Sequence, residues 1–468
     1  MEGDGQRLNL KREVGIIGAV SFIAGTMIGS GIFISPQYVL STIGSPGASL
    51  VIWAICGLIA MLGGLCYAEL GTIIPESGAE YIYMLRTAGK VVAFMFVFSF
   101  IMVMRPASAT GIALSFAEYV VAPFYYDCTP PQLLVKCVAA VGILVLAVVN
   151  CLSVRLATNI QVVTMVVKML ALVVIVLGGV VKLFQGSTEN FENSFEGSNV
   201  GVSSIGIAFY QGLWSYDGWN TLNYLTEELK HPEVNLPRAV VIAITLVTGL
   251  YLLVNVSYLT VMTPRELMSS SAVAVTWGNK VLGSWGWVMS VAAALSAFGS
   301  LNGTFFSGGR VCFVAAREGH MPDILAMAHV HRLTPSPALI FTTLISLVVL
   351  AIGDFQSIVN FFSFTAWIFY GITLSGLIYL KIKKPELPRP YKVPILLPIL
   401  VLIAAVFLVL APIIDDPQIE YLYVTLFILS GAIIYVPFIH YKLCPGLLTK
   451  LTVFMQLFLE VAPAEKNL

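Results

Sequence analysis

Long apolar stretches recur along the chain and are separated by short polar segments. Twelve of them approach or exceed the length of a bilayer span, which takes about 20 apolar residues. They lie at about 15–40, 48–73, 91–121, 134–151, 158–184, 203–226, 238–262, 284–313, 338–353, 357–380, 394–413 and 421–441. Because a helix satisfies its own backbone hydrogen bonds in lipid, the pattern predicts an all-α polytopic membrane protein with twelve transmembrane helices.

The composition supports a membrane protein and excludes other classes. Hydrophobic residues make up 58% of the 468 residues and charged residues only 11%, whereas soluble domains carry about 25% charged residues. A water-soluble protein of this size could not cover its surface with so few charges. The formal net charge is +0, which gives no general attraction to nucleic acid.

The positions of Lys and Arg predict the orientation. With a cytoplasmic N-terminal segment at 1–13, the outer segments hold only Lys136, Lys182, Arg265 and Lys280, and most other basic residues fall on the cytoplasmic side. This is the bias that membrane proteins show, so both termini are predicted to be cytoplasmic. In the tail at 442–468, Leu447–Val461 is apolar but too short to cross, which favours an interfacial helix.

Two of the predicted spans are interrupted by glycine. The first contains Gly25–Phe33, with three glycines, and the sixth contains Tyr210–Asn220, with Gly212 and Gly218. Each glycine costs a helix about 1 kcal/mol relative to alanine. Close helix packing through small residues would explain either segment alone, but it explains the pair less well.

Interruptions at matching positions of two halves are typical of transporters, where broken helices form the substrate site. The two interruptions lie five spans apart. They predict two inverted five-helix repeats at 14–184 and 202–380, a LeuT-like arrangement with helices 1 and 6 broken, and two appended helices at 394–441.

Broken helices provide binding groups for a free α-amino acid. The N–H groups at the start of a half-helix bind a carboxylate, and unpaired carbonyls accept an ammonium group. The candidates for the carboxylate are Ile28, Gly29, Ser30 and Gly31. Those for the ammonium group are Thr26, Tyr210, Gln211, Gly212 and Leu213, and those for the side-chain pocket and gate are Trp214, Asp217, Asn302 and Ser307.

Several motifs together resemble a known family. They are Gly25–Phe33 with Ser35-Pro36, Cys66–Gly71, Ser77–Ala79, Lys168, Trp214–Asn220, Thr226–Glu228 and Arg317–His320. They resemble the amino acid–polyamine–organocation superfamily, and more closely the L-type light chains of heteromeric amino acid transporters. Within that family, Ser215–Asn220 looks most like the b-zero-plus branch, which exchanges cationic and neutral amino acids and cystine.

The resemblance implies a sodium-independent obligatory exchanger of L-amino acids in the plasma membrane, without cofactor or enzymatic activity. Lys168 would stand where a related sodium transporter holds an ion. Cys128 is the one cysteine in a predicted outer loop, which by itself indicates an intermolecular disulfide or a free thiol. In the family, a cysteine here bonds a single-span type II glycoprotein heavy chain (rBAT-like or CD98-like).

Alternatives remain open at this stage. Asp217 could bind the side chain of a cationic substrate or pair with a cation of the protein. Arg105 could neutralise the charge of Asp217 or Glu69, or it could face an anionic group of the substrate. Trp214 could close over the substrate as an aromatic lid, or it could only pack against neighbouring helices. The rival functions are an exchanger restricted to neutral or aromatic amino acids, a sodium-coupled symporter and a non-transporting amino acid sensor.

Overall fold

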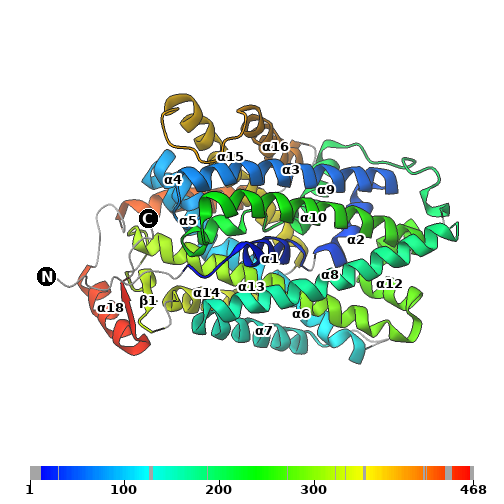
Figure 1. The fold of residues 1–468 in the computed structure, drawn as a ribbon, viewed down its shortest axis with the longest axis horizontal. Coiled ribbons are helices and arrows are strands. Elements are labelled where there is room, and N and C mark those ends of the chain that lie inside the picture. Colours follow the sequence, from blue (N-terminus) through cyan, green and yellow to red (C-terminus); the bar gives the residue numbers. More distant parts are fainter. Residues whose placement is uncertain are drawn as a thin grey trace.

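The protein is a bundle of long helices that run side by side along one axis (Figure 1). The computed structural model describes residues 12–29, 31–125, 130–186, 188–270, 272–321, 323–331, 334–351, 355–414, 417, 419–437 and 445–463. The all-helical polytopic class predicted from the sequence is confirmed, since only two three-residue strands occur in this part of the chain.

In the described residues of the first half of the chain there are eight α-helices and a π-helical turn. They are α1 (Ile16–Met27), α2 (Gly31–Ile43), α3 (Pro46–Ile73), α4 (Glu80–Thr87), α5 (Lys90–Ser99), the π-helical η1 (Phe100–Met104), α6 (Arg105–Val121), α7 (Gln132–Leu152) and α8 (Val154–Phe184). Two short 3-10 turns also occur: η2 (Ala122–Phe124) follows α6, and η3 (Glu189–Phe191) follows α8.

The second half begins at a second broken helix. It contains α9 (Val202–Ser215), the 3-10 helix η4 (Thr221–Glu228), α10 (Pro232–Val261), α11 (Pro264–Ser269), α12 (Val273–Val281), η5 (Gly283–Trp285), α13 (Trp287–Arg317) and η6 (Asp323–Ala326). Then come β1 (Met327–His329), α14 (Ser336–Leu350), α15 (Phe355–Lys383), α16 (Leu396–Ile414), α17 (Ile419–Tyr435), α18 (Pro445–Leu459) and β2 (Val461–Pro463).

Nine helices within the described residues are long and apolar enough to cross a membrane. Predicted spans 9 and 12 correspond to the shorter apolar helices Ser336–Leu350 and Tyr421–Tyr435. Predicted span 6 is missing from the nine because α9 has only 14 residues and ends at Ser215. The count of twelve spans and the inverted repeats stay predictions.

The outer faces of the bundle are apolar, as a lipid-facing surface requires. Val141 on α7, Val163 on α8 and Ile403 on α16 are each at least 60% exposed. By contrast, α1 and α13 lie in the interior, where α13 is buried along nearly its whole length. The two helices contact each other as well as α8.

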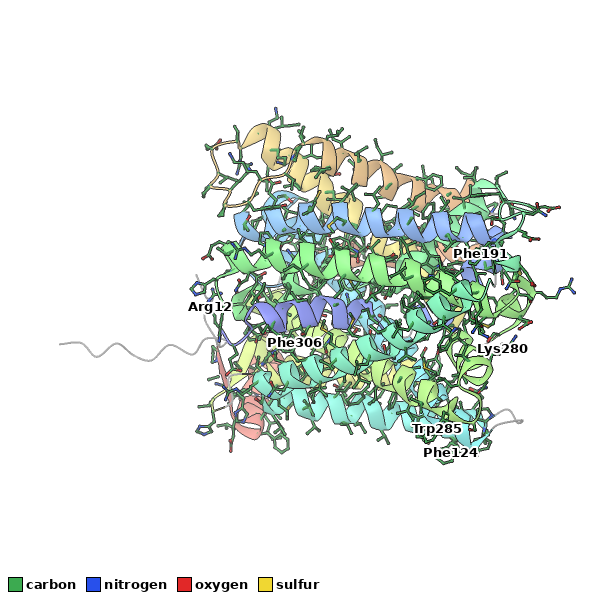
Figure 2. The ribbon with its side chains drawn as sticks, turned by 45° about the vertical axis from the view of Figure 1, so that its right-hand side comes forward. Arg12, Phe124, Phe191, Lys280, Trp285 and Phe306 are labelled. Atoms are coloured by element: carbon green, nitrogen blue, oxygen red, sulfur yellow. The ribbon has the colours of Figure 1, made fainter. Side chains whose placement is uncertain are left out.

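The beginning of α1 and the C-terminal β2 lie at the same end of the bundle. Figure 1 places β1 and α18 at this end, and Figure 2 places Arg12 there, with Lys280, Phe191 and Trp285 at the opposite end. β2 pairs antiparallel with β1, with Ala462 opposite Ala328. The side of the membrane on which the termini lie stays a prediction.

Candidate functional site

The first span is broken between α1 and α2, within the predicted Gly25–Phe33 segment. α1 ends at Met27 and α2 begins at Gly31. The N–H of Ile28 donates to Ala24 O (2.8 Å) and that of Gly29 to Met27 O (3.0 Å). Of the predicted carboxylate ligands, Gly31 is therefore the one whose N–H stands at a helix start, where intrahelical acceptors are lacking. Ser30 lies outside the described residues.

Side chains from neighbouring helices hold the carbonyl groups of this break. Lys168 Nζ on α8 donates to Gly25 O (2.5 Å) and Ile28 O (2.6 Å). Tyr251 on α10 donates to Met27 O (2.6 Å), and Ser300 on α13 donates to Thr26 O (3.0 Å). Lys168 thereby links α8 to the break between α1 and α2.

The second break lies within the predicted Tyr210–Asn220 segment, at the later of its two glycines. α9 runs unbroken through Tyr210–Leu213 to Ser215, and the chain then turns at Gly218, which has φ 109°. The carbonyls of Tyr210–Leu213 thus belong to a regular helix. Gly212 is a packing glycine, since a Cβ there would lie 2.7 Å from Cys56 Sγ on α3.

The two breaks are packed against each other. A Cβ on Gly31 would lie 2.8 Å from Ser215 Cα, and a Cβ on Gly218 would lie 2.7 Å from Thr26 Cγ2. The hydroxyl of Tyr251 bridges them, donating to Met27 O and lying 2.6 Å from Ser215 O as well. The glycines are therefore needed because no side chain fits between the two broken helices.

Two small cavities meet at this contact and share Trp214 and Asp217. The first is lined by Thr26, Met27, Gly29, Gly31, Ile112, Trp214, Asp217, Ser300 and Thr304. The second is lined by Leu213, Trp214, Asp217, Trp219, Phe362, Ser363, Ala366, Trp367 and Tyr370. Each has room for about one water molecule. The site is therefore closed in this structure.

Some predicted site residues come together at these cavities and others do not. Thr26, Gly29, Gly31, Trp214 and Asp217 line the first cavity, and Leu213 lines the second. Among the described residues, the buried Thr26 hydroxyl has no hydrogen-bond partner, so its hydrogen-bonding capacity is available to a ligand.

The remaining candidates lie elsewhere. The side chains of Tyr210 and Gln211 point to Leu408 O and Asn360. Asn302 was expected at the cavity, but its amide donates to Ala157 O and Gln161 Oε1. Ser307 was also expected there, but its hydroxyl donates to Thr304 O.

The cavity face of α13 carries hydroxyls that sequence reasoning missed. Ser296, Ser300 and Thr304 follow each other at a spacing of four residues, which places them on one side of a helix. That spacing could have indicated a polar face on this helix. The aromatic lining from Phe362, Trp367 and Tyr370 on α15 gave no comparable signal, because apolar aromatic residues recur in most of the spans.

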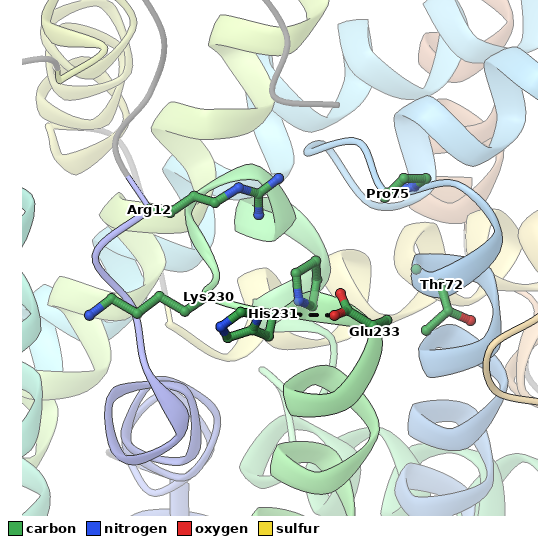
Figure 3. A pocket seen from close by; sticks show the side chains of 8 residues that line it. Arg12, Thr72, Pro75, Lys230, His231 and Glu233 are labelled. Carbon is green, nitrogen blue, oxygen red and sulfur yellow. Dashed lines mark ion pairs between the residues drawn. The ribbon is translucent and has the colours of Figure 1, made fainter.

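Ion pairs connect η4 to α13 near the end where α1 begins. Arg310 binds Glu228 (2.7 Å), with both side chains fully buried, and Arg317 binds Glu227 (2.5 Å). The N-terminal segment joins this cluster, since Val14 N–H donates to Glu228 O (3.1 Å). Arg12 donates to Leu229 O (2.7 Å) and lines a wider pocket beside η4 (Figure 3).

Comparison with known proteins identifies the family. Residues 14–438 match the profile of the amino acid permease family. The chain belongs to this family. It is 50% identical to the human b(0,+)-type amino acid transporter 1 over 461 residues, covering 98% of this chain and 95% of that protein.

Two further relatives are less similar in sequence. The human cystine/glutamate transporter is 40% identical over 99% of this chain and 93% of its own length. The mouse large neutral amino acids transporter small subunit 2 is 43% identical over 87% of this chain and 77% of its own. The resemblance to amino acid transporter light chains is thus confirmed. These relatives are named as transporters rather than enzymes, as predicted.

Proposed function

We propose that this permease is a sodium-independent obligatory exchanger of L-amino acids, neutral and cationic with cystine, and the transporting light chain of a disulfide-linked heterodimer. The observation that carries the proposal is the meeting of two broken helices at a cavity lined by Gly31, Trp214 and Asp217. Each part of the amino acid has a group there that fits its chemistry.

The α-carboxylate is assigned to the start of α2. The N–H of Gly31 and the positive end of that half-helix suit an anion, and the Thr26 hydroxyl, which has no partner, lies in the same cavity wall. The α-ammonium is assigned to the end of α9, where the carbonyl oxygens of Leu213, Trp214 and Ser215 accept hydrogen bonds from the protein and each have a second lone pair. Ligand binding then requires the closed site to open.

Sodium independence is proposed from Lys168. Its ammonium group is fully buried and lies between two carbonyls of the α1 break. A cation held there by the protein occupies carbonyl oxygens that would otherwise be available to coordinate a metal ion. This reasoning disfavours the sodium-coupled symporter.

The remaining assignments extend the family resemblance. A heavy-chain glycoprotein bonded through Cys128, a plasma membrane location and cytoplasmic termini are proposed on this basis. One relative carries the words "small subunit" in its name, which fits a larger partner. Cys128 itself lies outside the described residues.

A second candidate function is an exchanger restricted to large neutral or aromatic amino acids. The second cavity favours it, because Trp214, Trp219, Phe362, Trp367 and Tyr370 line it. Aromatic walls suit an apolar side chain. Among the described residues that line the two cavities, Asp217 is the one with a carboxyl or basic side chain, so it decides between the two candidates.

Competition in reconstituted vesicles tests the proposal. The purified chain is placed in vesicles without sodium, and uptake of labelled leucine into leucine-loaded vesicles is measured against unlabelled competitors. We expect leucine, phenylalanine, arginine and cystine to compete, and isocaproate and isopentylamine, which each lack one α-group, to fail. Competition by the neutral set alone would favour the second candidate. Equal competition by isocaproate or isopentylamine would contradict the assigned backbone site.

A further inference from the structure

A cavity of about 460 Å³ lies at the end of the bundle where α1 begins (Figures 2 and 3). Three parts of the chain form its walls: the segment before α1, the end of α3, and the turn from η4 into α10. Its lining residues are Arg12, Gly71, Thr72, Pro75, Lys230, His231, Pro232 and Glu233. Cavities of about 300–1,000 Å³ hold small molecules, so this one has room for a ligand.

The charged side chains of this cavity are mainly basic. Arg12 and Lys230 line it together with His231, and Glu233 is the one acid among the described lining residues. Arg12 donates to Thr226 O (3.4 Å) and Leu229 O (2.7 Å). Within the described residues these bonds use only Nη1, so Nε and Nη2 of the guanidinium can still donate to a ligand. The cavity therefore suits an anion.

The start of α10 adds to this positive potential. Its first two residues, Pro232 and Glu233, line the cavity, and His231 before them gives the helix no side-chain cap. The positive end of a helix dipole attracts anions and is a common position for phosphate groups. A phosphate monoester matches the basic side chains as well, because it carries up to two negative charges and three strong acceptor oxygens.

The outer face of α10 leads from lipid-facing residues to this cavity. Val241 and Ile242 are 41% and 49% exposed, as contact with lipid tails requires. Arg238 is also exposed and stands three residues before Val241, which places both on one side of the helix. Pro232 lies six residues before Arg238, or about 9 Å along the helix axis. The cavity thus lies just beyond the level at which the apolar face of α10 ends.

We propose that this cavity binds the phosphorylated headgroup of an anionic membrane lipid, with a phosphate monoester at Arg12 and Lys230 and the acyl chains along α10. The step from Arg238 to the cavity favours a headgroup that projects from the bilayer, as phosphorylated inositol does, over a plain phosphodiester. Basic pockets between transmembrane helices on the cytoplasmic side suit such headgroups. The proposal goes beyond amino acid exchange, and it uses only the proposed cytoplasmic position of the termini.

Binding to the purified full chain tests the proposal. The chain is placed in nanodiscs of phosphatidylcholine, and the anisotropy of a fluorescent short-chain phosphatidylinositol bisphosphate is measured, with empty nanodiscs as the blank. We expect saturable binding that the unlabelled bisphosphate lipid displaces and phosphatidylglycerol, a phosphodiester, displaces only weakly. Equal displacement by phosphatidylglycerol would overturn the assignment of a monoester. Equal displacement by soluble inositol trisphosphate would assign the cavity to a soluble phosphate compound and overturn the lipid as its source.

Single substitutions locate the binding. Lys230→Gln and Arg12→Gln are each expected to weaken it about fivefold, which is the contribution of one basic residue near an anionic membrane surface. Glu233→Gln removes the carboxylate of the cavity, so binding is expected to become tighter. Lys450→Gln is the matched control, because Lys450 is exposed on α18 at the same end of the bundle and does not line the cavity.

Two outcomes would place the binding elsewhere. Affinities of Lys230→Gln and Arg12→Gln equal to that of Lys450→Gln would overturn the proposal, and so would weaker binding by Glu233→Gln. Failure of the proposed function looks different, because it would show as no amino acid exchange by the unaltered protein and would leave the lipid titration unchanged.

Discussion

Replacing Gly31 by alanine puts one methyl group between the two broken helices. Its Cβ would lie 2.6 Å from Ser215 Oγ and 2.8 Å from Ser215 Cα. The hydroxyl can rotate away, but the Cα belongs to the backbone of α9. To restore an ordinary contact of 3.4 Å from 2.8 Å, α2 and α9 must move apart by about 0.6 Å at this point.

The expected cost follows from this overpacking. Forcing one extra methyl group into a packed interior costs about 1–3 kcal/mol. The strain falls on the closed arrangement of the site, so we expect the closed state to be disfavoured by this amount. That corresponds to a loss of about 5- to 150-fold in the equilibrium for closure, and exchange, which passes through closure in both directions, slows accordingly.

A matched control exists on α10. Gly249 is helical, and a Cβ there would meet nothing within 4 Å. Gly249→Ala should leave exchange unchanged and slightly stabilise the helix. The assay is leucine exchange in vesicles carrying equal amounts of each variant. Exchange by Gly31→Ala at the rate of Gly249→Ala would refute the argument that the two breaks close against each other.

Further predictions concern single side chains. Lys168→Gln removes the ammonium group from two carbonyls of the α1 break, so sodium-free exchange should fall at least about tenfold, whereas full activity would contradict the proposed role. Arg310→Met leaves Glu228 buried and unpaired, so the variant should lose about 3–5 kcal/mol of stability. Its Tm in detergent would show this, and adding Glu228→Gln should restore part of the loss. Burial lowers the pKa of His320, in the loop after α13, to about 4. Below about pH 6.5 the His320 side chain is protonated in the unfolded chain but stays neutral in the folded chain. The stability of the folded state therefore falls as the pH drops from about 6.5 toward 4. His320→Phe should flatten that part of the Tm profile. Cys128→Ser should abolish any heavy-chain band that is sensitive to reductant on gels.

The break in the first span could be predicted because glycine and hydroxyl residues are concentrated there. Gly25, Gly29 and Gly31 fall within nine residues, and the helix stops between Met27 and Gly31. The second break was predicted within Tyr210–Asn220, but the ammonium ligands were assigned around Gly212, where the helix continues. Only Gly218 adopts a positive φ, whereas Gly212 stays helical and makes room for Cys56. Which of two glycines ends a helix depends on tertiary packing, which the sequence alone does not display.

The choice of cavity residues on span 8 shows a similar limit. Each residue turns a helix by about 100°, so Ser300 and Thr304 face the cavity while Asn302 faces α7 and α8. Polarity alone did not distinguish these faces. The bond from Lys168 to the first break was predictable, because a cation at mid-span needs acceptors and broken backbone provides them.

Trans-stimulation without sodium tests the central claim most directly. Vesicles containing the purified chain are loaded with labelled leucine and suspended in sodium-free buffer, with or without external leucine. The account predicts that label leaves only when external leucine is present, and that adding sodium changes nothing. Release into buffer without amino acid would contradict obligatory exchange, and release that requires sodium would contradict the role proposed for Lys168.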